Sequence, residues 1–510
     1  MNNQEDKKPE KINKKPEKID KKPEKIDNRP VASGSFVGME ADKRHLTDFD
    51  RYVFTSAQNN THVHTDFLKS LATYCEHNNA QLVIGKFTYN KNGFQNDTKN
   101  DRGLHYDKLL SGYLSDKQGD IIPDDLVWCG DLNILPTAKY PLSGLEQYTG
   151  KASMIVPHAK IALESVPTAK YDRTKIMYTT GAVTLRNYIA KKAGQSAEPF
   201  HSFGALVVEV CRDSGLWFAR QVETDESGIF QDLDTVYYPN GATESARIEA
   251  INWGDIHSEK SDPVILDSCF GDGGILDQLN PRYALYHDLF DMEARNHHNR
   301  KSGHFLAFQH NSLGAGSVKE DIKTAGSVLD LADRGSCHGY IVESNHDLAL
   351  ESWLDSNEYD FKKDPINAVC YLDLNAHIYR SINKGKDPET LKFSLTGYLK
   401  KTRDNFTFLK TDQSLVIAGI EMAMHGHNGV NGSRGNPKTF RKLNMPINTG
   451  HTHTCSIHGS VYTAGVTGSL DMGYNVGGSS WSHSHIVTYA NGKRAIITQR
   501  KIGNSALFRL

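Results

Sequence analysis

The chain has 510 residues, enough for two to four domains, and its contents of 38% hydrophobic and 24% charged residues are typical of a globular protein. The formal net charge of −2 excludes a strong attraction of the whole molecule to nucleic acid, so such binding would require a local basic patch. The seven cysteines are scattered and include no Cys-x-x-Cys pair, which excludes a disulfide framework or a zinc ribbon and indicates reduced thiols in a cytoplasm.

The N-terminal segment is a short repeat. Residues 7–27 carry the sequence Lys-Lys-Pro-Glu-Lys-Ile-Asn/Asp three times in succession. A proline in every repeat and one apolar residue per seven exclude a coiled coil, so we predict that residues 1–39 form a disordered tail. An inert spacer is the favoured role, and peripheral association with an anionic membrane surface is the alternative. No apolar run approaches the ~20 residues of a membrane span, and the start lacks the apolar core of a signal peptide.

Residues 40–245 are predicted to form an α/β or α+β domain. A strand at 52–54, a helix at 66–75 and a strand at 81–84 indicate a βαβ unit. Further strands are expected at 126–128, 152–156 and 205–210, and strands at 217–222 and 235–238 are expected to flank a hairpin. His62 and His64 form a His-x-His pair without an ordered set of partners, so polar residues in a loop before a helix are the favoured interpretation.

Residues 246–510 are predicted to form a second, α/β domain. Short apolar strands at 248–251, 283–286, 339–342 and 414–418 run into polar loops, and a helix is expected over 318–332. α/β folds gather functional groups at one edge of the sheet in this way. Strands at 482–489 and 495–498 are expected to pair through Asn491 and Gly492, a favoured hairpin turn.

The polar loops carry five short motifs. In chain order they are Asp255-x-His257, Asp288-x-x-Asp291, Asn345-His346-Asp347, His425-Gly426 and Gly450-His451-x-His453. Helix caps, turn residues or structural histidines explain each motif alone, but five such coincidences in order favour metal ligands. The order resembles that of the calcineurin-like metallophosphoesterases over roughly residues 247–505, which implies a layered β-sheet sandwich flanked by helices. His287 and Ser344 stand where that family has glycine, which leaves the conformation of these two loops open.

The resemblance implies a centre with two divalent metal ions. Asp288 would bridge the ions; Asp255, His257 and His453 would complete one site, and Asn345, His425 and His451 the other. Oxygen and nitrogen ligands without thiolates favour Mn²⁺, with Mg²⁺, Fe and Zn²⁺ as alternatives. Two ions ~4 Å apart can activate a water and stabilise both oxygens of an in-line phosphoryl displacement. By the same resemblance, His346 donates a proton to the leaving oxygen and Asp291 orients it.

The metal centre alone does not select a substrate. Two basic stretches, 295–301 and 431–442, follow metal-binding motifs and point toward DNA, because cationic side chains there would hold phosphates. The candidate substrate contacts are Arg295, His297, His298 and Arg434. A solvated basic loop explains both stretches about as well.

The whole chain also resembles a family of pre-early DNA-transfer proteins of long-tailed coliphages, through Tyr52–Thr61, Trp253–His257 and Asn345–Asp347. This resemblance implies a metal-dependent DNase that degrades host DNA early in infection, assists phage DNA transfer, acts in the bacterial host cytoplasm and forms a homo-oligomer. The alternatives are a phosphomonoesterase or nucleotidase for small molecules, and a non-catalytic DNA-transfer scaffold with a structural metal centre.

Overall fold

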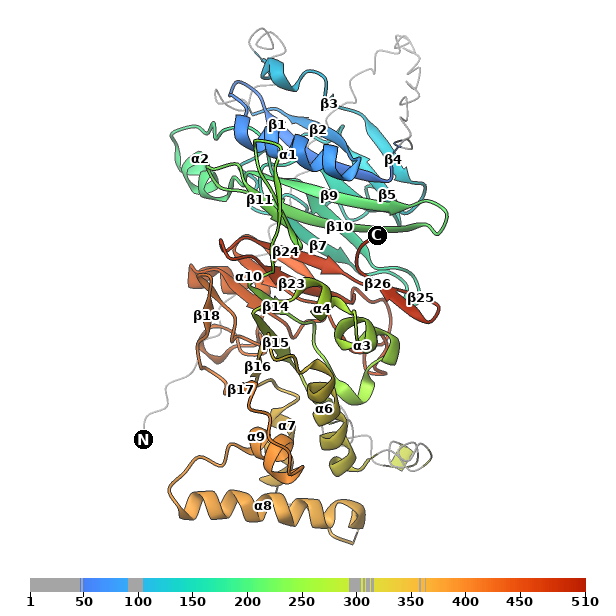
Figure 1. Cartoon of the computed structure of the whole chain (residues 1–510), viewed down its shortest axis with the longest axis vertical. Helices are drawn as coiled ribbons and strands as arrows, with labels where there is room; N and C mark the ends of the chain where they lie inside the picture. Colours follow the sequence, from blue (N-terminus) through green and yellow to red (C-terminus); the bar gives the residue numbers. More distant parts are fainter. Residues whose placement is uncertain are drawn as a thin grey trace, which may run out of the picture. The chain divides into compact units, whose positions relative to one another are not determined.

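The computed structural model describes residues 46, 49–89, 104–292, 304–305, 308, 312, 316–356, 359–362 and 364–510. Residues 41–510 form one compact unit of mixed α/β structure (Figure 1). The predicted tail at 1–39 lies outside the described residues. All seven cysteines are free thiols. In the described part of the chain, every helix is too short or too polar to cross a bilayer.

The first sheet has five strands in the order β10-β9-β1-β2-β3. These are β1 (Arg51–Gln58), β2 (Gln81–Phe87), β3 (Leu114–Ser115), β9 (Gly204–Cys211) and β10 (Leu216–Glu223). Helix α1 (Thr65–Asn78) connects the parallel strands β1 and β2, which confirms the predicted βαβ unit (Figure 1). His64 is the N-cap of this helix, and its Nδ1 accepts a hydrogen bond from the N–H of Phe67, so the structural interpretation of that histidine is confirmed.

The predicted hairpin between 217–222 and 235–238 was wrong. Strand β10 pairs with β9, whereas β12 (Thr235–Tyr237) lies between β11 (Phe230–Asp232) and β13 (Thr243–Ser245) in a sheet of its own. The 11 residues between β10 and β12 contain the strand β11, which takes β12 as its own partner, and β9 offers β10 a full-length partner instead.

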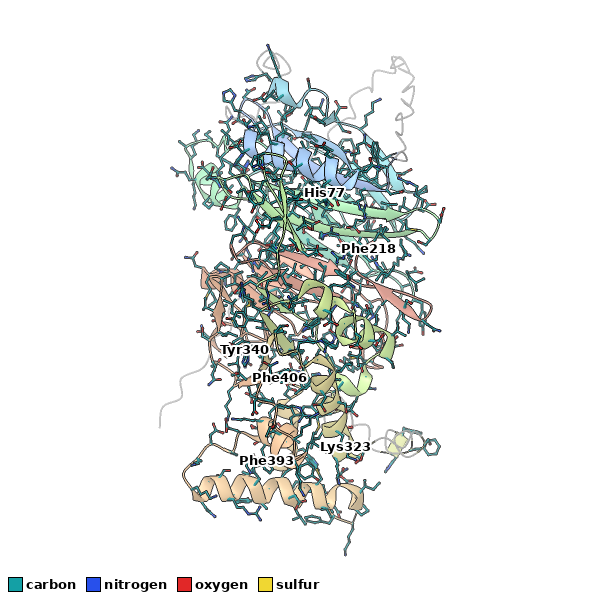
Figure 2. The ribbon with its side chains drawn as sticks, in the orientation of Figure 1. His77, Phe218, Lys323, Tyr340, Phe393 and Phe406 are labelled. Atoms are coloured by element: carbon teal, nitrogen blue, oxygen red, sulfur yellow. The ribbon has the colours of Figure 1, made fainter. Side chains whose placement is uncertain are left out.

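The second sheet has six strands in the order β17-β16-β15-β14-β23-β24. These are β14 (Ala250–Asn252), β15 (Tyr283–His287), β16 (His338–Val342), β17 (Phe406–Leu409), β23 (Ser484–Thr488) and β24 (Arg494–Thr498). Strands β14 to β17 are parallel, and β23 and β24 form the predicted hairpin. Tyr340 and Phe406 mark the neighbouring strands β16 and β17 in Figure 2. Helix α6 (Val318–Ala332) begins and ends as predicted, and the hydroxyl of Ser317 caps it.

The third sheet has ten strands in the order β18-β19-β20-β22-β21-β7-β8-β6-β5-β4. The strands are β4 (Gln118–Ile122), β5 (Leu126–Cys129), β6 (Ser153–Val156), β7 (Ala162–Val166), β8 (Lys175–Thr179), β18 (Val416–Ile417), β19 (Ile420–Glu421), β20 (Ile447–Thr449), β21 (Ser456–His458) and β22 (Val461–Thr463). The strand predicted at 414–418 is instead the hairpin β18–β19, because Ala418 and Gly419 take positive φ angles and reverse the chain. This sheet crosses the boundary predicted between residues 245 and 246, and the division into two domains stays a prediction.

The remaining elements are short or lie at the periphery. They are α2 (Lys192–Ala197), α3 (Pro263–Phe270), α4 (Ile275–Leu279), α7 (Leu348–Leu354), α8 (Ala368–Asn383), α9 (Thr390–Lys392), α10 (Pro437–Phe440), β25 (Arg500–Ile502) and β26 (Ser505–Leu507).

Apolar layers connect the three sheets. Phe54 of the five-stranded sheet stacks on Trp128 of the ten-stranded sheet, with ring centroids 4.9 Å apart. Leu285 of the six-stranded sheet packs with Ile420 and Met422 at the other end of the ten-stranded sheet. The opposite face of the six-stranded sheet is covered by helices that include α3 and α6. The predicted α/β class is therefore confirmed, and two sheets face each other where the candidate metal ligands begin.

The strand orders repeat the same arrangement twice. In the five-stranded sheet, β1, β2 and β3 run parallel, β9 pairs antiparallel with β1, and β10 pairs antiparallel with β9. The six-stranded sheet repeats this order and these directions with β14, β15 and β16 followed by β23 and β24. In the ten-stranded sheet, β4-β5-β6-β8-β7 matches β18-β19-β20-β22-β21 strand by strand.

The two arrangements meet at the pairing of β7 with β21. Leu163 lies opposite Ile457, Ala162 opposite His458, and Glu164 opposite Ser456. Leu163 and Ile457 also hold the same position within their own halves, since each pairs with the tyrosine of the next strand. Such reciprocal pairing is what a two-fold axis produces at an interface between like units.

Candidate metal centre

The predicted ligands lie just beyond the carboxyl ends of five strands. Asp255 and His257 follow β14, Asp288 follows β15, Asn345 follows β16, His425 follows β19, and His451 and His453 follow β20. The carboxyl ends of parallel strands meet at one edge of a sheet, and the six- and ten-stranded sheets pack against each other at this end. The fold therefore brings together seven side chains that are spread over about two hundred residues of sequence.

Asp288 lies between two groups of side chains. Its Oδ2 is 3.4 Å from Nε2 of His257 and also 3.4 Å from Nε2 of His425. On one side, Nε2 of His453 lies 3.0 Å from Nε2 of His257 and 3.1 Å from Oδ2 of Asp255. One ligand atom from each of Asp255, His257, Asp288 and His453 lies within 4.8 Å of the others, so these four side chains can hold a metal ion.

The other side of Asp288 holds the second predicted group. Nε2 of His425 lies 3.1 Å from Oδ1 of Asn345. The rings of His425 and His451 have centroids 5.2 Å apart. The structure thus brings all seven predicted ligands into one cluster, with Asp288 in the central position that a bridging ligand would occupy.

Several of these residues have strained backbone. His257, Asp288, His451 and His453 have φ angles of 45°, 45°, 71° and 57°, in the left-handed region that side chains other than glycine and asparagine rarely adopt. Each costs on the order of 1–3 kcal/mol, and such strain gathers where function demands a particular side-chain direction. Gly450 is required for a related reason, because a Cβ there would lie 2.2 Å from Oδ1 of Asp255.

The buried polar atoms of the cluster fit a cation. Both oxygens of Asp288, together with Oδ1 of Asp255 and Nδ1 of His425 and His453, are buried and have no hydrogen-bond partner. A buried carboxylate without donors is costly unless a cation compensates its charge. The donor set is imidazole nitrogen with carboxylate and amide oxygen, and no cysteine is part of it, which suits a borderline or hard divalent ion.

The pKa shifts of His425, His451, His453 and Asp288 agree with a ligand set in its metal-binding protonation state, whereas burial raises the pKa of Asp255, and Asp288 and Asp291 raise that of His257 despite its burial. Burial lowers the pKa of His451 to about 4 and holds those of His425 and His453 well below the usual value, so these imidazoles are neutral. Burial acts to raise the pKa of Asp288, but the neighbouring imidazoles, His425 first among them, hold it well below the usual range. Neutral imidazoles and an ionised carboxylate are the forms that bind metals.

Asp291 lies closer to a predicted ligand than to the predicted proton donor. Its Oδ1 is 3.1 Å from Nδ1 of His257 and 3.5 Å from Nδ1 of His346. The Nδ1 of His346 also lies 3.0 Å from the backbone oxygen of Asp291. Asp291 therefore fixes the ring of His257 with Nε2 toward the cluster, as carboxylates do for metal-binding histidines, and it holds His346 mainly through its main chain.

The two positions where the family has glycine are accommodated. His287 is the last residue of β15 and does not take a positive φ, since the left-handed conformation falls on Asp288 instead. The N–H and Oγ of Ser344 lie 3.2 and 2.9 Å from Oδ2 of Asp347, whose Oδ1 accepts from the N–H of Phe290. Asp347 thus ties the loop after β16 to the loop after β15.

The sequence alone did not identify two positioning residues. The buried carboxylate of Glu259 accepts hydrogen bonds from the N–H groups of Asp291 and Met292, at 2.7 and 3.3 Å, and so shapes the Asp288–Asp291 loop. Trp481 lies edge-on to His453, with ring centroids 4.2 Å apart. Neither belongs to a motif, because their roles depend on contacts between segments distant in sequence.

The predicted substrate contacts are only partly described. Arg295, His297 and His298 lie outside the described residues. Arg434 is exposed, in a loop that a bridge between Asn428 and Arg434 closes. It is therefore available to solvent on the segment that follows His425.

Comparison with known proteins gives one informative result. No protein-family model and no solved structure matches the chain. Protein A1 of Escherichia phage T5 is 48% identical over 459 residues, which cover 88% of this chain and 81% of that protein. Identity at that level over most of both chains shows common descent. The chain belongs to the family of Protein A1 of Escherichia phage T5.

Proposed function

We propose that the chain is a two-metal-dependent phosphodiesterase that cleaves DNA. The observation that carries this proposal is the position of Asp288, whose Oδ2 is 3.4 Å from an imidazole nitrogen of each ligand group. A shared carboxylate between two sets of ligands suits a pair of ions that act on one phosphoryl group. The order of the five motifs supports a metallophosphoesterase-type sandwich as the more specific description of the fold.

The proposal assigns a role to each residue of the cluster. Asp255, His257 and His453 would hold one ion, and Asn345, His425 and His451 the other, with Asp288 shared; Mn²⁺ is the proposed metal. Bound ions would supply Lewis acidity and a nucleophile at neutral pH. The contact of the His346 Nδ1 with the backbone oxygen of Asp291 requires a proton on Nδ1, which assigns proton donation toward the leaving oxygen to Nε2.

DNA is the proposed substrate because of the resemblance to phage pre-early proteins and the phage source of the relative. The proposal includes degradation of host DNA early in infection, assistance to phage DNA transfer, action in the bacterial host cytoplasm and assembly into a homo-oligomer. The exposed guanidinium of Arg434 supports a contact with a phosphate of the strand.

The test is cleavage of supercoiled plasmid by metal-stripped protein supplied with Mn²⁺, Mg²⁺, Zn²⁺ or chelator, beside Asp288→Ala. Metal-dependent cutting that is lost in the variant supports the proposal. Intact plasmid with turnover of p-nitrophenyl phosphate would indicate a phosphomonoesterase. Failure on both substrates would leave a structural metal centre in a scaffold.

A further inference from the structure

The first half of the chain (β1 to β10) carries the fold of the second half (β14 to β24) but only part of its predicted ligand set: His158 keeps a histidine at the position of His451, whereas other ligand positions are changed. Counted from the ends of the matching strands β6 and β20, Pro157-His158-Ala159-Lys160 stands where Gly450-His451-Thr452-His453 stands. The N–H of Val183 donates to the oxygen of Ser56 at 2.9 Å, as that of Thr467 donates to the oxygen of Asp255 at 2.8 Å. Ser56 therefore takes the place of a predicted ligand.

A cation stands at the central position of the first half. Gly85 and Lys86, near the end of β2, match His287 and Asp288 at the end of β15, and Lys86 forms a 2.5 Å ion pair with Asp116. Lysine in place of a bridging carboxylate excludes a two-metal centre there. The space is also filled, because Phe87, Ala159 and Ala182 form a fully buried apolar cluster.

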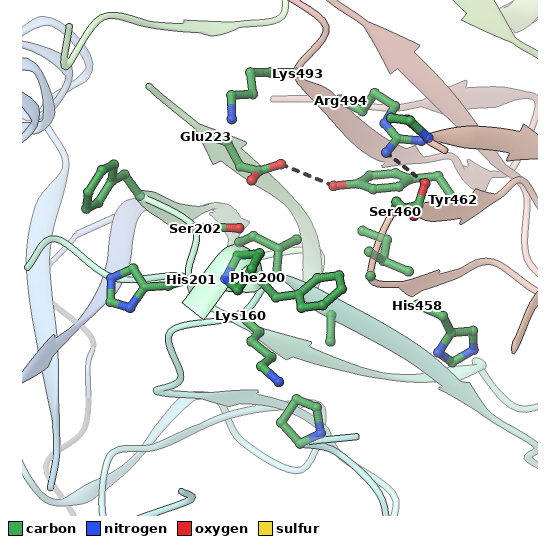
Figure 3. Close-up of a pocket in the computed structure, with 18 of the residues that line it drawn as sticks. Lys160, Phe200, His201, Ser202, Glu223, His458, Ser460, Tyr462, Lys493 and Arg494 are labelled. Atoms are coloured by element: carbon green, nitrogen blue, oxygen red, sulfur yellow. Dashed lines mark hydrogen bonds between the residues drawn. The ribbon is translucent and has the colours of Figure 1, made fainter. Parts of the chain in front are cut away.

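A cavity of about 430 Å³ lies beside this altered site (Figure 3). Both halves line it: Lys160 and Phe200 come from the first, and Lys493 and Arg494 from the second. A second cavity of equal volume lies beside the metal centre, at the position that the approximate two-fold axis between the halves relates to the first cavity. The residues that line it include Lys170, Trp481 and Lys501. The two cavities are equivalent in position and differ in how their charges are paired.

Cations in the first cavity gather around aromatic rings. Arg441 lies over both Tyr140 and Phe200, at 5.3 and 5.7 Å from the ring centroids. Lys139 lies 5.4 Å from the Tyr140 centroid, and Lys160 lies 5.7 Å from that of Phe200. Among the described residues, no carboxylate lies within 4.0 Å of the charged groups of Lys139, Lys160, Arg441 or Lys493.

The carboxylates of this cavity have partners of their own. Glu226 pairs with Arg186 at 3.1 Å, and Glu223 accepts a hydrogen bond from the hydroxyl of Tyr462. The carboxylate of Asp225 is bound by Ser227, and that of Glu164 lies 3.9 to 4.0 Å from His458 and Lys438. In the equivalent cavity, by contrast, three cations have carboxylate partners, since Lys170 pairs with Asp471, Lys501 with Asp262 and Arg173 with Asp125; the buried Arg500 is the cation there that pairs with no carboxylate among the described residues.

We propose that this cavity binds the phosphodiester backbone of a nucleic-acid strand, so that the altered half holds substrate for the catalytic half. Clustered cations that lack carboxylates repel one another, and a ligand with closely spaced phosphates relieves that repulsion. The exposed ring of Phe200 adds a surface on which a base can stack. Arg441 belongs to the basic stretch after His425, so the segment that begins at the metal centre ends at this cavity. The choice of a strand as the ligand rests on the proposed function.

The test is binding of a fluorescein-labelled 20-nucleotide single strand to the full chain in chelator, so that no turnover occurs. The double variant Arg441→Ala/Lys493→Ala removes two cations of the cavity. The control Lys323→Ala/Lys392→Ala removes two exposed cations that pair with Glu320 and Glu389 (Lys323 is labelled on α6 in Figure 2). Melting temperatures and anisotropy at several salt concentrations are measured for all three proteins.

The cavity variant is expected to bind about 10-fold or more weakly, and its slope of log K against log salt to fall by about 1.4, for two lost phosphate contacts. The control is expected to stay within about twofold of the wild type. Equal affinity of the two variants overturns the proposal. If inorganic phosphate raises the melting temperature of the wild type alone while strand affinity is equal, the ligand is a free phosphate compound and the assignment to a strand is overturned.

This outcome is separable from that of the proposed function. Asp288→Ala should bind the strand in chelator like the wild type while failing to cut plasmid. If the wild type cuts no plasmid but the cavity variant still loses strand affinity, the phosphodiesterase assignment fails and the binding site stands.

Discussion

Replacing Asp288 by asparagine tests the two-metal arrangement most directly, because the change keeps the shape of the side chain and removes its charge. In the wild type, metal at 100 times its dissociation constant stabilises the folded chain by about 2.7 kcal/mol per site, or about 5 kcal/mol for two independent sites. Asp288 contacts both ligand groups, so Asp288→Asn should lose most of this gain. In chelator the variant should lose some stability as well, because the neighbouring imidazoles hold the pKa of Asp288 well below its usual range and so favour the charged carboxylate in the folded chain; the comparison therefore rests on the metal-dependent gain of each protein.

The assay is urea unfolding with chelator and with excess Mn²⁺, together with metal analysis of the purified proteins. Asp412→Asn is the matched control, since Asp412 is exposed and also has a positive φ, of 68°. The control should show the full metal-dependent gain and two ions per chain. Two ions and an undiminished gain in Asp288→Asn would refute the bridging role and, with it, the argument from the 3.4 Å contacts.

Three further predictions follow from other parts of the structure. His346→Ala should retain both ions in metal analysis yet slow DNA cleavage by roughly 10²–10⁴-fold; an empty centre would refute its role as a proton donor. Arg220→Met leaves the buried carboxylates of Glu209 and Asp232 without their partner, and urea unfolding should show that the free energy of unfolding falls by about 3–5 kcal/mol. The control Lys410→Met, which breaks an exposed ion pair, should lose less than about 1 kcal/mol. Burial lowers the pKa of His485 to about 4, so between pH 6.5 and 4 the unfolded chain takes up a proton that the folded chain does not. The free energy of unfolding in chelator should therefore fall by about 2 kcal/mol for this histidine between pH 7.5 and 5.0. A urea midpoint that stays constant over that range would contradict this assignment.

The elements that the sequence predicted well are those fixed by local physics. Helix α6 matches its predicted bounds because Ser317 caps it and apolar residues recur at helical spacing up to Ala332. The ligand cluster could also be predicted from the sequence, since each motif follows a short apolar strand and the carboxyl ends of parallel strands meet at one edge of a sheet. Both predictions needed only the local pattern of apolar and polar residues and the rule that parallel strands align their carboxyl ends.

The elements that the sequence did not predict depend on long-range pairing. Nothing near Thr235 indicates that β12 pairs with β11 and β13 and that β9 takes β10 instead. The sequence does not reveal the repeat, because the two halves share few residues. One shared stretch is Tyr178-Thr179-x-Gly181, which matches Tyr462-Thr463-x-Gly465. Strand order needs only apolar alternation, which many residues satisfy, so the fold can persist after the ligands have been replaced.

The half that carries the candidate metal centre depends on the first half for its own core. Ile486 and Ile496 of the six-stranded sheet are buried in the same apolar cluster as Tyr52 and Trp217 of the first half. Without the first half, these side chains and the unpaired edge of β21 would meet water, and exposed edges and apolar patches lead to aggregation. A chain that begins at residue 246 should therefore be insoluble or self-associate, whereas loss of the basic cavity alone should leave folding intact. A soluble, monomeric fragment 246–510 that binds two metal ions would show instead that the first half is dispensable for the centre.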